Sequence, residues 1–267
     1  MGEVKLRLLH PEDLPDLMAL TTAAGWNQTP EDWQRLLHLE PSGAFGIEME
    51  GRIVASATVL KYGRELAWIG MVLTLPAFRG RGFARSLMER ALAYAAPCCV
   101  RLDASDMGKS LYRSLGFADE YLVERWQREA QTGPSLPDWA AAAPPDYSLD
   151  RDIYGCDRRR LLERLAEDSI FDPGGFALGR RGARTFHFGP CLARDCWTAA
   201  RLAQHFVGRH SNEPMNWDLC PGVPGVVDLA RSLGFGRART LTRMVRGGDP
   251  QRTPDSRLIA LAGFEYG

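Results

Sequence analysis

The segment 79–85 carries the residue types best suited to hold a phosphate group. Its glycines and arginines are Arg79, Gly80, Arg81, Gly82 and Arg85. Because glycine has no Cβ, the backbone can approach a ligand closely at these positions. The guanidinium groups supply fixed charge and several donors for phosphate oxygens. From residue types alone we expect a phosphorylated ligand here.

The flanking sequence places this segment between a strand and a helix. Residues 68–75 form an apolar run typical of a buried strand, and Pro76 ends it. From Phe83 onward, apolar residues recur with the spacing of one helix face; they are Ala84, Leu87, Met88, Ala91, Leu92 and Ala95. The first N–H groups of a helix lack intrahelical partners and carry partial positive charge. A helix that begins after such a turn therefore favours phosphate binding.

Three other ligand-binding patterns fit this sequence less well. An RNA-binding Arg-Gly tract would repeat, whereas here a single copy lies between a strand and a helix. Gly108-Lys109-Ser110 matches the end of a P-loop, but that motif needs glycine at the position of Asp103. A dinucleotide-binding Rossmann turn requires a third glycine, which the segment lacks.

Two motifs make the sequence resemble the GNAT N-acetyltransferase superfamily. Arg79-x-x-Gly82-x-Ala84 fits the Arg/Gln-x-x-Gly-x-Gly/Ala signature of that family, with a proline and an apolar strand in the expected places before it. The second motif, Leu-Tyr-x-x-Leu-Gly-Phe at 111–117, follows at the right distance. The resemblance implies an α/β fold of the α+β type, in which a mixed, mostly antiparallel twisted sheet is flanked by helices.

The resemblance also implies roles for individual residues. Acetyl-CoA is the expected co-substrate, and its pantetheine would pair like an extra strand with the exposed backbone of Val72, Leu73 and Thr74. The residues expected to bind the rest of acetyl-CoA are Arg79, Gly80, Arg81, Gly82, Phe83, Ala84, Arg85 and Asp106. Asp106 departs from the asparagine common in the family, which leaves its role open. Tyr112 is the expected general acid that protonates the departing thiolate.

The sequence offers candidates for the acceptor side as well. A primary amine near pKa 10 is mostly charged at neutral pH and must lose a proton before it attacks a thioester. Asp103, at the end of a predicted strand, is a candidate base, although it could instead cap the following helix. Trp26 and Asn27 lie in a loop between two predicted helices, which lines the acceptor pocket in the GNAT family. Alternatively, Trp26 packs against the core and Asn27 caps a helix.

The second half of the chain repeats part of the first. Arg-Ser-Leu-Gly-Phe occurs at 113–117 and again at 231–235, each time before a strand-like segment. We expect tandem GNAT folds: a catalytic domain at 1–131, a linker at 132–145 and a degenerate GNAT-like domain at 146–267. In the second copy Ala230 replaces Tyr112, and the corresponding loop at 189–194 lacks the signature. Such a copy would supply a wall of the acceptor pocket or a dimer surface.

Composition and charge narrow the partners. Lysine plus arginine and aspartate plus glutamate number 33 each, so no net field attracts nucleic acid or an anionic membrane. The sequence shows no long apolar run, no signal peptide, no C-x-x-C pair and no metal-ligand spacing of histidines. We therefore expect a cytoplasmic protein that uses no metal and has neither nucleic acid nor a membrane as partner; a homodimer is left open.

Two functions of different classes remain after the sequence analysis. The first is an acetyl-CoA-dependent N-acetyltransferase that acts on a primary amine of a small molecule or an amino terminus by direct attack. The second is an acetyl-CoA-binding sensor or scaffold without turnover. Retention of Tyr112 together with the complete loop favours the enzyme, because a sensor needs no acid for a thiolate.

Overall fold

The strands of the chain form one mixed sheet in the computed structural model, which describes residues 3–131, 146–251 and 253–267. The strands are β1 (Val4–Leu8), β2 (Ala44–Met49), β3 (Arg52–Tyr62), β4 (Leu66–Thr74), β5 (Cys99–Ala104), β6 (Ala118–Arg128), β7 (Asp168–Asp172), β8 (Gly175–Arg180), β9 (Phe186–Ala193), β10 (Met215–Leu219), β11 (Gly236–Arg246) and β12 (Leu258–Ala260). Their order is β1-β2-β3-β4-β5-β11-β6-β10-β9-β8-β7, and β12 pairs with β9. The predicted linker at 132–145 lies outside the described residues.

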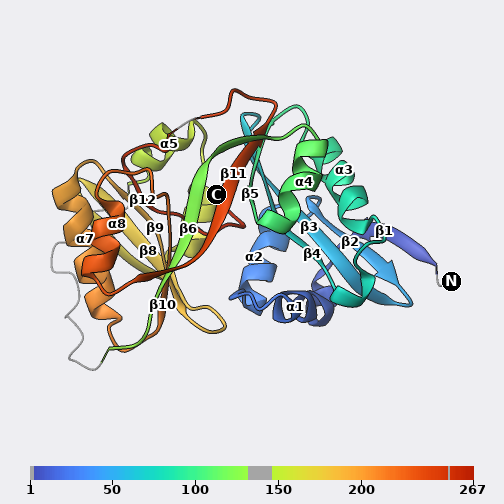
Figure 1. Cartoon of the computed structure of the whole chain (residues 1–267), viewed down its shortest axis with the longest axis horizontal. Helices are drawn as coiled ribbons and strands as arrows, with labels where there is room; N and C mark the ends of the chain where they lie inside the picture. Colours follow the sequence, from blue (N-terminus) through green and yellow to red (C-terminus); the bar gives the residue numbers. More distant parts are fainter. Residues whose placement is uncertain (1–2, 132–145, 252) are drawn as a thin grey trace.

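Helices flank this sheet, as Figure 1 shows. They are α1 (Leu14–Ala23), α2 (Pro30–Leu39), α3 (Phe83–Ala95), α4 (Asp106–Ser114), α5 (Ser148–Tyr154), α6 (Arg159–Leu165), α7 (Cys196–Arg209) and α8 (Val226–Ser232), with short 3₁₀ turns η1 (Pro11–Asp13) and η2 (Pro76–Phe78). Among the described strands only β4–β5 and β9–β10 pair in parallel. A parallel pair needs a crossover connection, and α3 and α7 lie in these two crossovers. The predicted fold class, a mostly antiparallel mixed sheet flanked by helices, is confirmed.

Helices of the first half cover both faces of the sheet. Successive side chains of a strand point to opposite faces, and β3 shows the consequence. Ile53 and Leu60 join a hydrophobic cluster that contains residues of α1 and α2. Val54 and Val59 join a second cluster that contains Leu87 and other residues of α3. The first cluster continues into the second half of the chain, so a common apolar core holds the two halves together.

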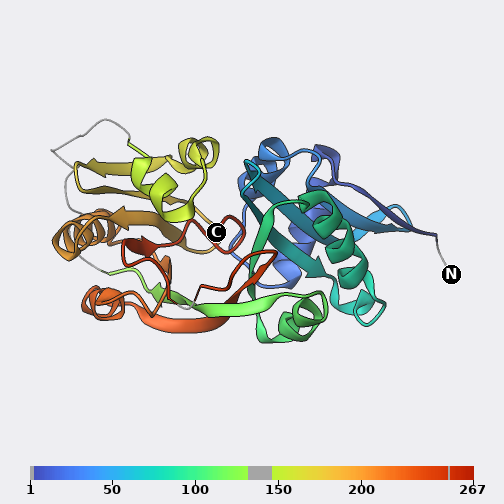
Figure 2. The same ribbon diagram turned by 90° about the horizontal axis from the view of Figure 1, so that it is seen from above.

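The centre of the sheet is built from both halves. β11 lies between β5 and β6 and runs antiparallel to each, with Met244 opposite Leu102 on β5 and Leu241 opposite Val123 on β6. Figures 1 and 2 show β6 and β11 side by side where the halves meet. The repeated Arg-Ser-Leu-Gly-Phe segments lie directly before these two strands. The repeat therefore precedes two strands, one from each half, that pair with each other. β11 of the second half also pairs with β5 of the first, and β6 of the first half also pairs with β10 of the second.

The segment 262–267 of the second half packs against β3 and β4 of the first. The indole nitrogen of Trp68 donates to the carbonyl of Phe264 at 2.9 Å, and the hydroxyl of Tyr62 donates to the carbonyl of Tyr266 at 2.8 Å. A Cβ on Gly70 would lie 2.9 Å from Cα of Glu265, so glycine at this position allows the close contact. The backbone of 262–267 is thereby fixed against the strand that leads into the 79–85 loop.

A buried ion-pair network joins α2 to the second half at the same place. Asp32 belongs to the capping box of α2, where its carboxylate accepts from the backbone N–H of Thr29. The same carboxylate accepts from Arg35 at 2.6 Å and from Arg180 of β8 at 3.0 Å. Arg180 also donates to the carboxylate of Glu265 at 2.9 Å. Because buried charges are tolerated only when paired, this network ties three separate segments together.

One local prediction for the second half is wrong. The segment 189–194, expected to be the counterpart of the 79–85 loop, lies mostly within β9. Pairing with β8 on one side and β12 on the other extends this strand through Cys191 and Leu192. The turn into α7 is therefore shorter than the sequence indicates. Among the residues that the structure describes, no helix combines the length and apolarity needed to span a bilayer.

Candidate functional site

The loop that begins α3 has the geometry expected for an anion-binding turn. Gly80 and Gly82 have φ values of 76° and 81°, a region that favours glycine, and a Cβ at either position would meet no atom within 4 Å. Gly82 is the N-cap of α3, and no side chain caps the helix start. The first N–H groups of α3 therefore stay available for a ligand from solvent.

A cavity of about 740 Å³ extends from this loop along the end of β4 to α4. The predicted co-substrate residues that line it are Val72, Leu73, Thr74, Arg79, Gly80, Gly82, Phe83, Ala84 and Arg85. Arg81 and Asp106 are not among its lining residues. The guanidinium of Arg81 lies over the ring of Phe78, and the exposed carboxylate of Asp106 pairs with Lys109 at 3.0 Å. Of these two partners, Phe78 itself lines the cavity, whereas Lys109 does not.

The end of β4 is free to pair with a ligand because it diverges from β5. Among the described residues, β4 pairs with β5 only over Leu66, Ala67 and Trp68. Further along, Met71 has a φ of 50°, and the β3–β4 register shifts there as in a β-bulge. The carbonyl of Met71 accepts from the buried hydroxyl of Ser56 at 2.8 Å. Such strain in a non-glycine residue is typical of functional sites, and the sequence pattern gives no sign of it.

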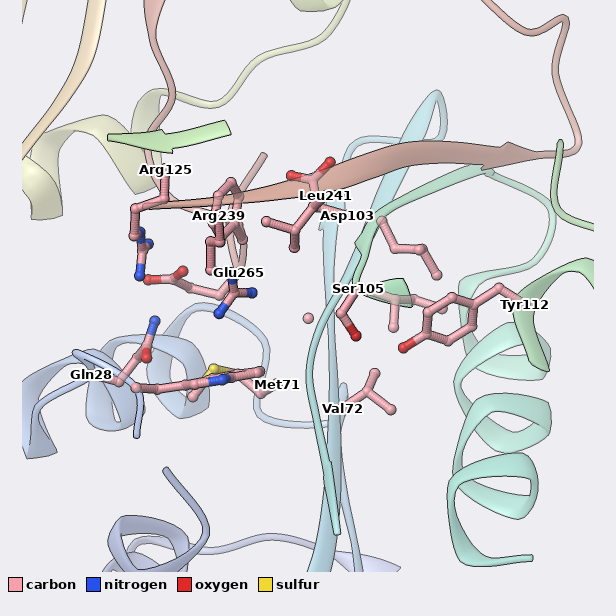
Figure 3. Close-up of a pocket in the computed structure, with 15 residues that line it drawn as sticks. Gln28, Met71, Val72, Asp103, Ser105, Tyr112, Arg125, Arg239, Leu241 and Glu265 are labelled. Atoms are coloured by element: carbon pink, nitrogen blue, oxygen red, sulfur yellow. The ribbon is translucent and has the colours of Figure 1, made fainter. Parts of the chain in front are cut away.

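Tyr112 lies where this cavity narrows. It is 8% exposed, and its ring packs edge-to-face with Phe117 at 6.1 Å between centroids. Burial raises the pKa of Tyr112 to about 12. The phenol therefore stays protonated at neutral pH, the form that a general acid needs. In Figure 3 its hydroxyl points toward Ser105 and Val72 rather than into the helix behind it.

A second, narrower pocket of about 80 Å³ continues from the first. The two share the lining residues Trp26, Val72, Ser105, Tyr112 and Arg239. Other lining residues come from the second half of the sheet and from the segment beyond it; they are Arg125, Leu241, Phe264 and Glu265. Arg239 and Leu241 belong to β11, so the exchanged strand forms part of the pocket wall. Figure 3 shows Arg125, Arg239, Leu241 and Glu265 around a common space.

The predicted base, Asp103, lines the narrow pocket but is held in an ion pair. Its side chain is fully buried, and both carboxylate oxygens accept from Arg243 of β11 at 2.9 Å. Burial raises the pKa of Asp103, while the charge of Arg243 acts in the opposite direction. Asp103 and Arg243 are opposite each other in the β5–β11 register. The geometry therefore gives Asp103 a structural partner that engages both of its oxygens.

The predicted acceptor residues Trp26 and Asn27 separate in the structure. Trp26 lines both pockets. Asn27 lines neither: its side-chain oxygen accepts from the backbone N–H groups of Arg184 and Thr185 at 2.8 and 3.1 Å, and its amide donates to the carbonyl of Thr185 at 3.0 Å. Asn27 therefore fastens the loop before α2 to the turn between β8 and β9. Asn27 caps no helix, because Thr29 is the N-cap of α2.

Sequence reasoning missed much of the narrow pocket. Gln28 follows the two candidate residues directly, yet a glutamine in a loop carries no distinctive pattern. Phe264 and Glu265 lie far along the chain from the recognised motifs, and Arg125 and Arg239 lie on the strands that follow the two repeated segments without belonging to either motif. Only the position of β11 and the packing of 262–267 bring them to the site. The repeat before β11 was the available signal, because it indicated that the two halves are related.

In the part of the second half that the structure describes, the crossover helix begins differently from α3. Its crossover helix α7 begins after Asp195, whose carboxylate accepts from the N–H of Thr198 at 2.8 Å. The cap satisfies one of the free donors with the chain's own negative charge. In the place of Tyr112, α8 carries Ala230, which is buried and has no acidic proton. The described residues also hold no cluster of three or more histidine, cysteine, aspartate or glutamate side chains suited to a metal ion.

Comparison with known families agrees with this geometry. The family described as "Acetyltransferase (GNAT) family" matches residues 12–117, and "Acetyltransferase (GNAT) domain" matches residues 147–260. Together the two matches cover most of the chain. The chain belongs to the GNAT superfamily. It is a two-domain member of that superfamily, and the family implies acyl transfer from an acyl-CoA.

Individual relatives resemble this GNAT protein over nearly its whole length. The curated "Holothin acyltransferase" of Pseudoalteromonas sp. (strain SANK 73390) is 23% identical, with 92% of this chain and 88% of the relative covered. A "Putative Acetyltransferase" structure from Pyrococcus horikoshii has a TM-score of 0.85 at 19% identity, covering 99% of this chain and 96% of the other. The "Tandem GNAT protein from the clavulanic acid biosynthesis pathway" has a TM-score of 0.61 at 14% identity, covering 93% and 100%. At these identities the structural likeness shows the fold alone.

Proposed function

We propose that this GNAT protein is an N-acetyltransferase that moves the acetyl group of acetyl-CoA to a primary amine of a small molecule. The observation that carries the proposal is the junction of the two pockets at Tyr112. One side has an open cavity with an uncapped helix start, and the other has a narrow pocket whose volume suits a small acceptor group. The curated relative is named as an acyltransferase, which supports the reaction class.

The residues of the larger cavity suit the parts of acetyl-CoA in order along its length. Gly80 and Gly82, together with the first N–H groups of α3, would hold the pyrophosphate. The diverging end of β4 would pair with pantetheine through the backbone of Leu73 and Thr74. The bulge at Met71 turns the N–H of the following residue away from a regular ladder position. That N–H is our candidate donor to the carbonyl oxygen of the thioester.

The chain's own groups can account for the proton movements. The amine nitrogen attacks the thioester carbonyl, a C–N bond forms, and the C–S bond breaks. A backbone donor that stabilises the developing charge on oxygen typically contributes on the order of 100-fold or more to rate. The hydroxyl of Tyr112 gives its proton to the departing sulfur, and the nitrogen returns a proton to the phenolate. Acetyl-CoA and the amine thus yield an amide and free CoA thiol.

Calorimetric titration of acetyl-CoA tests the first half of the proposal. A Gly82→Glu variant places a negative charge at the helix start, where it should repel the pyrophosphate. Gly155→Glu is the matched control, because Gly155 also has a positive φ and a Cβ there would meet no atom within 4 Å. We expect micromolar binding by the wild type and the control, and none by Gly82→Glu. Equal binding by all three proteins would place the co-substrate elsewhere.

Release of free thiol tests the second half. The wild type is incubated with acetyl-CoA and a panel of small primary amines, and thiol is recorded over time. Amine-dependent release that Tyr112→Phe lowers would support the enzyme. Tyr121→Phe is the control, since Tyr121 is partly buried but lines neither pocket of the site. Tight binding of acetyl-CoA without release for any amine would support the sensor instead.

A further inference from the structure

Two buried oxygens in the narrow pocket have no hydrogen-bond donor. Gln28 is 7% exposed and Glu265 is 2% exposed, and both line the pocket. Oε1 of Gln28 and Oε2 of Glu265 lack a partner among the described residues. The other oxygen of Glu265 accepts from Arg180. An unpaired buried acceptor is costly, so two in one pocket indicate that a ligand supplies the donors.

The same pocket contains a cation without an acidic partner. Arg239 and Arg125 are opposite each other in the β6–β11 register, an arrangement that is unfavourable for like charges. Arg125 is neutralised by Asp218, with two contacts of 2.7 Å. No carboxylate among the described residues pairs with Arg239, whose guanidinium lies over the ring of Phe264. Burial and the charge of Arg125 lower the pKa of Arg239, so an anion bound beside it would be stabilised.

The remaining walls limit the size and polarity of the ligand. The pocket measures about 80 Å³, and apolar side chains form much of its surface, among them Trp26, Ile69, Met71 and Leu241. The space suits a few heavy atoms with a short apolar side chain. The backbone of Glu265 touches Gly70, directly before the bulge at Met71. Glu265 lines the same narrow pocket as Gly70, Met71 and Val72 of the strand that would hold the thioester.

We propose that the acceptor is a small amino acid with a neutral side chain, whose amine is bound by Gln28 and Glu265 and whose carboxylate is bound by Arg239. This deepens the proposed function and rests on it. The ammonium group donates to the two unpaired oxygens, and Glu265 accepts one of its protons and later releases it to solvent. The neutral amine then attacks the thioester. Glu265 thus performs the deprotonation that the sequence assigned to Asp103.

Paired acceptors separate recognition of the carboxylate from recognition of the amine. Alanine and ethylamine differ only by the carboxylate, as do glycine and methylamine. We expect the kcat/KM of the wild type to be at least about 100-fold higher for alanine than for ethylamine, because a site built for a polar group discriminates strongly against its absence. Arg239→Gln should lower kcat/KM for alanine much more than for ethylamine, so that the ratio between the two acceptors falls toward one. Similar kcat/KM values of the wild type for alanine and ethylamine would overturn the proposal.

Two variants control for structural effects. Arg237→Gln removes a charge from the same strand, at a side chain that is 63% exposed and outside both pockets. It should leave kcat/KM for alanine and for ethylamine unchanged. Glu265→Gln keeps the size of the side chain and an oxygen for Arg180. It should lower kcat for both acceptors and weaken the rise of kcat with pH, with the folded state verified by circular dichroism. An unchanged pH profile in a folded Glu265→Gln variant would remove Glu265 from the proton transfer and overturn this part of the proposal.

The experiments distinguish failure of the proposed acetyl transfer from failure of the proposed amino-acid site. If acetyl-CoA binds but no amine is acetylated, the enzyme proposal fails. The amino-acid site is then tested by calorimetric titration of alanine into protein saturated with CoA. Binding of alanine by the wild type that is lost in Arg239→Gln supports the amino-acid site. Absence of alanine binding by the wild type overturns it.

Discussion

A methyl group at residue 108 should slow catalysis without unfolding the protein. Gly108 lies in the first turn of α4, one helical turn before Tyr112. A Cβ at this position would lie 2.6 Å from Cε2 and 3.2 Å from the hydroxyl oxygen of Tyr112. Carbon atoms in contact are normally about 3.5 Å apart, so the tyrosine ring must move by about 1 Å. The ring can rotate to do so, but its hydroxyl then leaves the junction of the two pockets.

The size of the effect follows from this displacement. Misplacing a reacting group by about 1 Å costs on the order of 100-fold in rate, which corresponds to about 2.7 kcal/mol in the activation barrier. Stability should respond differently. Alanine is favoured over glycine within a helix by about 1 kcal/mol, which offsets part of the cost of moving the ring. We therefore expect Gly108→Ala to lower kcat strongly while the thermal midpoint changes little.

The assay is thiol release at saturating acetyl-CoA and amine, with thermal unfolding followed by circular dichroism. Gly236→Ala is the matched control, because Gly236 has no positive φ and a Cβ there would meet no atom within 4 Å. The double variant Gly108→Ala, Tyr112→Phe identifies the route of the effect. If Gly108→Ala acts through the tyrosine hydroxyl, it should have little further effect once that hydroxyl is gone.

Two results would refute this reasoning. A kcat for Gly108→Ala equal to that of the wild type would show that the position of the Tyr112 ring does not limit the reaction. A full, additive loss in the Tyr112→Phe background would show that the methyl group acts on the co-substrate instead. A raised KM for acetyl-CoA in both backgrounds would accompany the second result.

Three further predictions follow from the site. Because burial raises the pKa of Tyr112 to about 12, its phenol is protonated below that pH, and kcat should show no falling limb up to pH 10; a limb near pH 10 that Tyr112→Phe abolishes would contradict this. Asp103→Asn leaves the buried guanidinium of Arg243 without a counter-charge and should lower the free energy of unfolding by about 3 kcal/mol, measured by urea titration; a large loss of kcat at unchanged stability would restore Asp103 as the base. Asn27→Ala breaks three hydrogen bonds to the β8–β9 turn and should cost about 1–3 kcal/mol of stability with an unchanged KM for the amine, whereas Trp26→Ala should raise that KM; the opposite pattern would return Asn27 to the acceptor site.

The co-substrate side of the site was predictable because its signals are local. The apolar run before Pro76, the glycines at 80 and 82 and the helical spacing after Phe83 all occur within one short stretch of chain. Glycine with positive φ, an uncapped helix start and an apolar helix face depend mainly on neighbouring residues. Tyr112 could be placed because it lies in a motif at a fixed distance from that loop. Fold class followed from the order of such elements.

The residues of the narrow pocket could not be predicted from local sequence patterns. Glu265 lies 195 residues after Gly70, which it touches, and no local pattern encodes that contact. Arg239 reaches the pocket because β11 inserts between β5 and β6. This strand pairing depends on contacts across the whole sheet and not on neighbouring residues in the chain. The same insertion makes removal of the second half a poor test of acceptor binding, since it would leave β5 and β6 without their common neighbour.

Asp103 and Asn27 show the same limit from the other side. Each has a residue type that can do chemistry; Asp103 lies at the end of a predicted strand and Asn27 in a loop between two predicted helices. Arg243 and the β8–β9 turn, more than 130 residues away in the chain, give both of them structural partners. The sequence by itself determined the loop, the helix that follows it and the position of Tyr112 in its motif, because short-range geometry specifies them. Tertiary structure alone decided which charged side chains remain unpaired in the narrow pocket, because burial and pairing depend on segments that only folding brings together.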